Sequence, residues 1–98
     1  MIEVRQTLEF QSWRRALRDV RARAAIARRV TRMQAGNFGD VKYLGDGASE
    51  ARLDVGPGYR VYFHRRGNVL VILLCGGDKS TQAEDIQKAK AMIPDLEM

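Results

Sequence analysis

The sequence contains very few of the residues that form disulfides or bind metals. Its 98 residues include one cysteine, Cys75, and one histidine, His64. A single cysteine cannot form an internal disulfide, and this pair cannot assemble a Cys/His zinc site. We therefore expect a domain without a metal or other cofactor, in a reducing compartment.

Long apolar runs are absent as well. The longest, residues 69–75, has seven residues, whereas a helix needs roughly 18 to cross a membrane. The first residues do not combine a basic segment with an apolar stretch, which is the pattern of an export signal. We expect a cytoplasmic protein that has no membrane partner.

Positive charge, by contrast, is in excess. Seventeen lysines and arginines outnumber twelve aspartates and glutamates, which gives a net charge of +5 and an isoelectric point near 9.9. Residues 5–35 hold nine arginines against two acidic residues, a net +7, while residues 80–98 carry −2. Because guanidinium groups make bidentate contacts with phosphate, this distribution favours a polyanionic partner.

The chain is long enough for one hydrophobic core, so we expect one domain over residues 1–98. Alternating residues predict a strand at 2–6, and helical spacing of apolar residues predicts a helix from Thr7. Asp19 could end this helix and cap a second one, which Gly36 would follow as its C-cap. Because neither glycine nor proline separates the two, one long kinked helix is the alternative. The apolar stripe of the first helix is Leu8, Phe10, Trp13, Leu17 and Val20.

The rest of the chain reads mainly as strands. After a turn cluster at 36–40, strands are predicted at 41–44, 50–55, 59–65 and 69–75, the last apolar on both faces. Thr81 and Glu84 form a capping box that predicts a short final helix, which Pro94 stops. The fold class is therefore α+β: an N-terminal strand and a helical hairpin packed on a mainly antiparallel sheet of four to five strands.

Two sets of residues are candidates for function. If Leu53 and Phe63 face the helical pair, alternation places four polar residues on the opposite sheet face, where they can converge: Arg52, Arg60, Tyr62 and His64. Such a set suits a phosphodiester, and Lys79, in the loop after the last strand, is a further candidate. The second set is expected to contact nucleic acid: Arg28, Arg29, Arg32 and Lys42.

Four segments, taken together and in order, resemble a known family: residues 35–40 (AGNFGD), 56–63 (GPGYRVYF), 76–82 (GGDKSTQ) and 85–86 (DI) with 89–90 (AK). They are similar to the addiction-module killer branch of the RelE/ParE toxin superfamily, close to the HigB-type toxins. The resemblance covers essentially the whole chain. It implies a RelE/ParE-like fold and the toxin half of a bacterial type II toxin–antitoxin pair, neutralised by a small helix-turn-helix antitoxin.

The resemblance also implies a reaction. RelE- and HigB-like members cut mRNA on the ribosome without a metal, whereas ParE-like members poison DNA gyrase. Arg60 matches the strand arginine of the family, a phosphate and transition-state contact. Arg52 matches a second basic position of the family. Lys79 matches the basic residue that follows the strand predicted here at 69–75.

RNA carries its own nucleophile, the 2′-hydroxyl, so the protein must align it, remove its proton, stabilise the phosphate and protonate the leaving oxygen. His64 is the natural base because an unperturbed imidazole has a pKa of about 6.5. Tyr62 and Lys79 are the alternatives, and the sequence leaves all three open. It also leaves open a gyrase inhibitor and a non-catalytic nucleic-acid-binding module.

Overall fold

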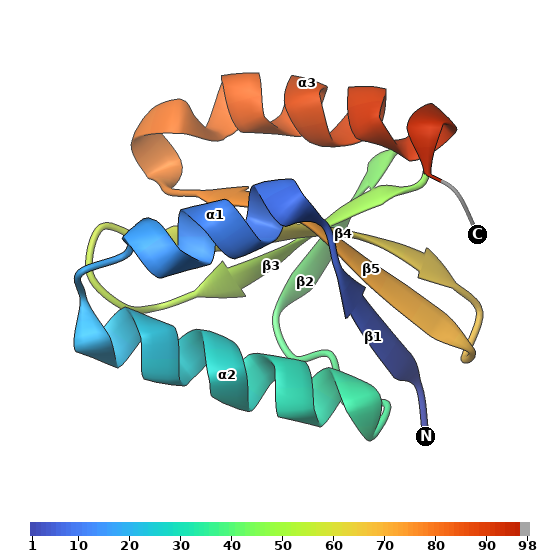
Figure 1. The fold of residues 1–98 in the computed structure, drawn as a ribbon, viewed down its shortest axis with the longest axis horizontal. Helices are drawn as coiled ribbons and strands as arrows, with labels where there is room; N and C mark the ends of the chain where they lie inside the picture. The colour runs from blue at the N-terminus through green and yellow to red at the C-terminus, as the bar shows by residue number, and fades with distance from the viewer. Residues whose placement is uncertain (97–98) are drawn as a thin grey trace.

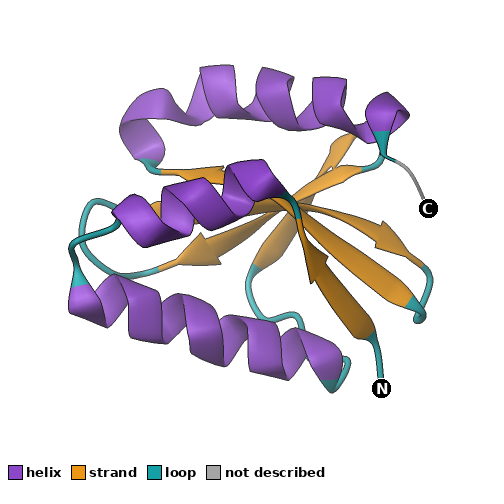
Figure 2. Ribbon diagram, viewed as in Figure 1, coloured by secondary structure: helices purple, strands orange, loops and turns teal. Residues whose placement is uncertain are grey.

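Five strands form one mixed sheet at the centre of the computed structural model, which describes residues 1–96 (Figures 1 and 2). In spatial order they are β1 (Glu3–Gln6), β5 (Leu70–Gly77), β4 (Tyr59–Arg66), β3 (Ala48–Leu53) and β2 (Val41–Gly45). β1 runs parallel to β5, and the other neighbours are antiparallel. The α+β class and the mainly antiparallel sheet are therefore confirmed.

Helices cover both faces of this sheet. α1 (Leu8–Ala16) and α2 (Val20–Gln34) pack on one face, and α3 (Gln82–Met92) packs on the other (Figure 1). The carboxylate of Asp19 caps α2 by accepting a hydrogen bond from the Ala22 amide at 3.1 Å. Two helices with a tight turn are confirmed, because Asp19 supplies the break that glycine or proline would otherwise provide. No helix within residues 1–96 is long and apolar enough to cross a membrane.

The sheet separates two hydrophobic clusters. Phe10 of α1 and Ile26 and Met33 of α2 pack against the face of the sheet that carries Val61 and Phe63. The opposite cluster joins strand residues to α3: Tyr62, Ile72, Leu74, Cys75 and Ala89. β5 contributes to both clusters, which explains why its sequence is apolar on both faces.

Three local predictions are wrong. The strand expected at 50–55 is β3, which lies two residues earlier, because the turn at 54–58 begins directly after Leu53. Leu8 and Val20 stand at the first positions of their helices and are 79% and 68% exposed, outside the core. Thr81 does not cap α3: its hydroxyl donates to the Asp85 carboxylate at 2.6 Å, and the expected box is not formed.

Candidate functional site

A cleft of about 250 Å³ gathers three of the predicted basic residues, Arg52, Arg60 and Lys79. Arg52 and Arg60 are directly opposite each other in the antiparallel register of β3 and β4, so their side chains leave the same face of the sheet. Lys79 reaches the cleft from a single 3₁₀ turn (Lys79–Thr81) that connects β5 to α3. The other lining residues are Asp40, Leu53, Asp54 and Gly58.

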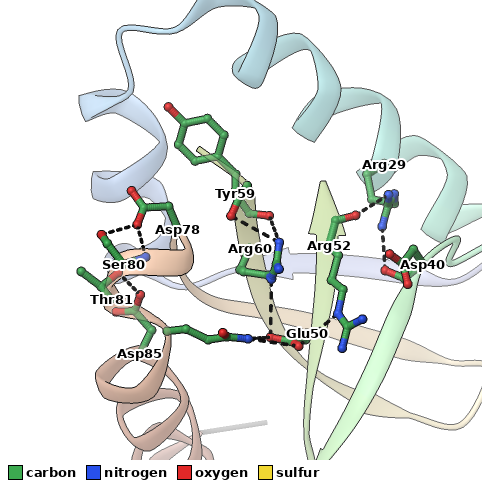
Figure 3. Close-up of polar contacts among 12 residues, drawn as sticks. Arg29, Asp40, Glu50, Arg52, Tyr59, Arg60, Asp78, Ser80, Thr81 and Asp85 are labelled. Carbon is green, nitrogen blue, oxygen red and sulfur yellow. Dashed lines mark hydrogen bonds and ion pairs between the residues drawn. The ribbon is translucent and has the colours of Figure 1, made fainter. Parts of the chain in front are cut away.

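The buried carboxylate of Glu50 anchors both arginines. Glu50 is 1% exposed; it accepts a hydrogen bond from Nε of Arg52 at 3.2 Å and lies 3.9 Å from Nε of Arg60 (Figure 3). The side-chain amide of Gln82, at the start of α3, donates to the same carboxylate at 3.0 Å. A charge this deeply buried is stable only when it is paired, so the two guanidinium groups are held in place.

The two arginines differ in how much they present to solvent. Nη1 of Arg60 also donates to the carbonyls of Gly58 and Tyr59, at 3.3 Å each, and its side chain is 11% exposed (Figure 3). The Arg52 side chain is 37% exposed. Arg60 therefore forms a rigid floor of the cleft, while Arg52 presents its guanidinium at the opening.

Gly58 allows Lys79 to lie over this floor. A Cβ atom at position 58 would approach Cε of Lys79 to 2.8 Å, and the Gly58 backbone has a φ of +81°. Asp78, the residue before Lys79, accepts hydrogen bonds from the hydroxyl and the amide of Ser80, and these bonds lower the pKa of its carboxyl. The 3₁₀ turn that carries Lys79 is thus capped by Asp78, the residue that precedes it.

Tyr62 and His64 lie outside the cleft, so the expected convergence of all four strand residues is wrong. Tyr62 is fully buried under α3, and its hydroxyl has no hydrogen-bond partner among the described residues 1–96. Burial raises the pKa of Tyr62, and the nearby Glu50 carboxylate raises it further, so its phenol is a poor base at neutral pH. His64 follows Arg60 by four strand residues, roughly 13 Å, and its Nδ1 lies 2.8 Å from the carbonyl oxygen of Gly47.

The structure separates Arg29 from the other residues expected to contact nucleic acid. The guanidinium of Arg29 donates to the backbone carbonyls of Asp40 and Arg52 at 3.2 and 2.8 Å (Figure 3). It also donates to the carbonyl of Phe38 at 3.4 Å. Burial lowers its pKa. Arg29 therefore ties α2 to β3, and its expected contact with nucleic acid stays a prediction.

The remaining three members are exposed but do not share one site. Arg28 and Arg32 project from α2 and border a small groove that Asp54 also lines. Lys42 lies on the edge strand β2, opposite Glu50 in the register. These three residues are accessible, and Asp54 offsets part of the charge beside the two arginines.

Three carboxylates of the site were missed by sequence reasoning. Asp40 and Asp54 line the cleft, and Glu50 lies beneath it. The alternation of β3 indicates that Glu50 shares a face with Arg52; the sequence lacks a signal that Asp40 comes near. Within residues 1–96, no group of three His, Cys, Asp or Glu side chains is placed to share a metal ion.

The fold and the cleft define a small α+β domain in which a buried carboxylate fixes two arginines beside a lysine. The chain is 53% identical over 95 residues to an uncharacterized protein of Haemophilus influenzae strain Rd. The match covers 97% of this chain and 96% of that protein, and the chain belongs to the same family. No family model and no solved structure matches the chain.

Proposed function

We propose that the chain is the toxin of a bacterial type II toxin–antitoxin system, with a RelE/ParE-like fold, and that it cuts mRNA on the ribosome without a metal. Its location is the cytoplasm, where a helix-turn-helix antitoxin neutralises it. The observation that carries the proposal is the cleft in which Arg52, Arg60 and Lys79 stand over the buried Glu50. Such a site binds a phosphate that carries extra negative charge in the transition state.

Two segments on which the family resemblance rests meet at this cleft. Residues 56–63 supply Gly58 and Arg60, and residues 76–82 supply Lys79 and Gln82. Lys79 packs over Gly58, and Gln82 binds the carboxylate that holds Arg60. The resemblance and the geometry therefore support the same site.

The reaction uses donors that are already in place. Arg52 and Arg60 orient the scissile phosphate and stabilise the charge that develops on its oxygens. An arginine stays protonated and is a poor base, so the proton of the 2′-hydroxyl goes to a carboxylate of the cleft, Asp40 or Asp54. The ammonium group of Lys79 protonates the leaving 5′-oxygen. Glu50 acts through the two arginines and is a positioning residue.

Primer extension on a reporter mRNA, after brief induction of the chain, tests the proposal. We expect growth arrest and discrete new 5′ ends with the wild type, and neither with Arg60→Ala at equal protein level. An SOS response without new 5′ ends would instead indicate a gyrase inhibitor. Absence of toxicity would indicate a non-catalytic nucleic-acid-binding module.

A further inference from the structure

A second polar pocket, of about 400 Å³, lies between the end of β1, α1 and the beginning of α2. We call it the arginine pocket; its lining residues are Gln6, Gln11, Arg14, Arg15 and Arg23. Arg14 and Arg15 belong to the last turn of α1, and Arg23 belongs to the first turn of α2. The tight turn at Asp19 therefore brings the three arginines to the same pocket. The proposed reaction does not use this pocket.

The charge of the arginine pocket is uncompensated. Three arginines line it, and none of its lining residues within the described 1–96 carries a carboxylate. The neighbouring groove with Arg21 and Arg28 differs, because Asp19 and Asp54 line it as well. An anion that enters the arginine pocket therefore meets no repulsion from its walls.

Part of the wall is held by hydrogen bonds before any ligand arrives. Nη2 of Arg15 donates to Oε1 of Gln11 at 3.2 Å, and Nε2 of Gln11 donates to the carbonyl of Gln6 at 3.4 Å. This chain fixes Arg15 relative to the end of β1 and reduces the conformational freedom that it would lose on binding.

The geometry points to the phosphodiester backbone of RNA as the occupant, an inference that rests on the proposed nuclease function. All five lining residues are polar, whereas a peptide ligand needs apolar anchors for much of its binding energy. Arginine and glutamine side chains instead offer the donors that contact phosphate and sugar oxygens. The pocket therefore docks a part of the RNA that is not cut.

The arginine pocket lies on the side of the sheet that carries α1 and α2, whereas Arg52 and Arg60 of the cleft leave the face on which α3 packs. The α1–α2 turn and the loops before β4 and after β5 share one end of the fold in Figure 1. Contacts confirm this proximity: Asp19 approaches Gly56, and the rings of Trp13 and Tyr59 meet edge to face at 6.2 Å. An RNA strand that engages both sites must therefore pass around this end of the fold.

Binding of a fluorescent 2′-O-methyl oligoribonucleotide of about 12 nucleotides, which cannot be cleaved at its 2′ positions, tests the inference. The variant is the triple Arg14→Gln, Arg15→Gln and Arg23→Gln. Its matched control is Arg18→Gln, Arg21→Gln and Arg66→Gln, which removes the same charge from exposed arginines outside the pocket. Circular dichroism and thermal unfolding verify that both variants fold.

We expect the pocket variant to bind the oligonucleotide at least about 10-fold more weakly, with a salt dependence reduced by about 2 in the log–log slope. The control should lose about 3-fold or less. Equal losses in both triples would mean a general charge effect and would overturn the inference, as would unchanged affinity of the pocket variant. Loss of binding to a polyglutamate peptide with RNA affinity unchanged would assign the pocket to an acidic protein and overturn it too.

Failure here is distinguishable from failure of the proposed function. RNA affinity reports on the pocket, and new 5′ ends in mRNA report on the cleft. A wild type that cuts mRNA, with a pocket variant that binds normally, overturns only the docking site. A wild type that binds through the pocket but never cuts overturns only the nuclease.

Discussion

The cleft and the arginine pocket each gather three cations, yet they are built in opposite ways. In the cleft, Glu50 lies beneath the arginines, and two aspartates share the wall with them. In the arginine pocket, no carboxylate is among the lining residues that the structure describes. The comparison shows that a count of basic residues does not define a site, because compensation by acidic groups decides what each cluster does.

A carboxylate beside the arginines weakens their attraction for an anion, but it fixes the geometry of their side chains. The buried Glu50 carboxylate cancels part of the field of Arg52 and Arg60, and in return it restricts both side chains. Fixed donors favour a reaction, because no free energy is spent on orienting them at the transition state. Guanidinium groups that no neighbouring carboxylate compensates favour capture of a polyanion from solution.

Arg60→Gln should impair the reaction in the cleft while leaving RNA binding at the arginine pocket nearly unchanged. We expect the rate of mRNA cleavage to fall about 100-fold or more, because a transition-state donor is lost. Affinity for the uncleavable oligonucleotide should change by about 3-fold or less, since the docking contacts remain. Single-turnover cleavage and fluorescence anisotropy on the same preparation measure the two effects. An equal loss in both assays would contradict the division of labour.

Glu50→Gln should show what the anchor contributes. The change leaves Nε of Arg60 buried without a carboxylate, so we expect the free energy of unfolding to fall by about 2–3 kcal/mol. Cleavage should slow about 10-fold while RNA affinity stays within about 2-fold. Urea denaturation and cleavage assays measure these effects; the exposed Glu84→Gln on α3 is the matched control. Unchanged stability would show that Glu50 does not hold the arginines.

Arg29→Ala and Arg28→Ala separate structural from exposed arginines on adjacent positions of α2. Loss of the three carbonyl contacts of Arg29 should lower the free energy of unfolding by about 2 kcal/mol. Arg28→Ala removes an exposed side chain and should change it by about 0.5 kcal/mol or less. Denaturant titration of both variants gives the difference, and equal values would refute the structural role of Arg29.

Tyr62→Phe should have a smaller effect at neutral pH than the loss of Glu50 or Arg29. It removes a buried hydroxyl that has no partner in the described part of the chain, so we expect about 1 kcal/mol of added stability and unchanged cleavage. A strong loss of cleavage would restore Tyr62 as a reacting group.

The same variant has a pH signature. The pKa of Tyr62 is raised in the folded state, so above pH ~10 the unfolded chain releases a proton that the folded chain retains. Stability therefore falls as pH rises through this range, by up to about 1.4 kcal/mol per pH unit for each such group. Burial also raises the pKa of Cys75, to about 12, so Tyr62→Phe should reduce this loss without abolishing it. Denaturant titrations between pH 8 and 11 measure the slope.

Local sequence patterns predicted the order of the helices and strands and the pairing of Arg52 with Arg60 in the site. Asp19 at a helix start and glycines at the turns are local signals, and they lie where the elements change. The alternation of β3 and β4 also placed Arg52 and Arg60 on one face correctly. In each case the physics acts between residues that are close in the sequence or directly paired.

The rest depends on contacts between distant segments. Alternation groups Tyr62 with Arg60 but does not reveal that α3 covers Tyr62 and leaves the cleft open. The contacts of Arg29 require the chain at 38–40 to pass beside α2. The arginine pocket likewise exists only because one tight turn brings two helix ends together.

The parallel pairing of β1 with β5 has a consequence for how the protein is made. Residues 3–6 are synthesised early, but the strand they pair with, at residues 70–73, emerges only after most of the chain. Lys79 and Gln82, which complete the cleft, follow later still. The sheet can form only after residues 70–73 are made, and the cleft only after Lys79 and Gln82 are made. A nascent chain on the ribosome therefore carries the arginine-rich helices long before it carries an assembled cleft.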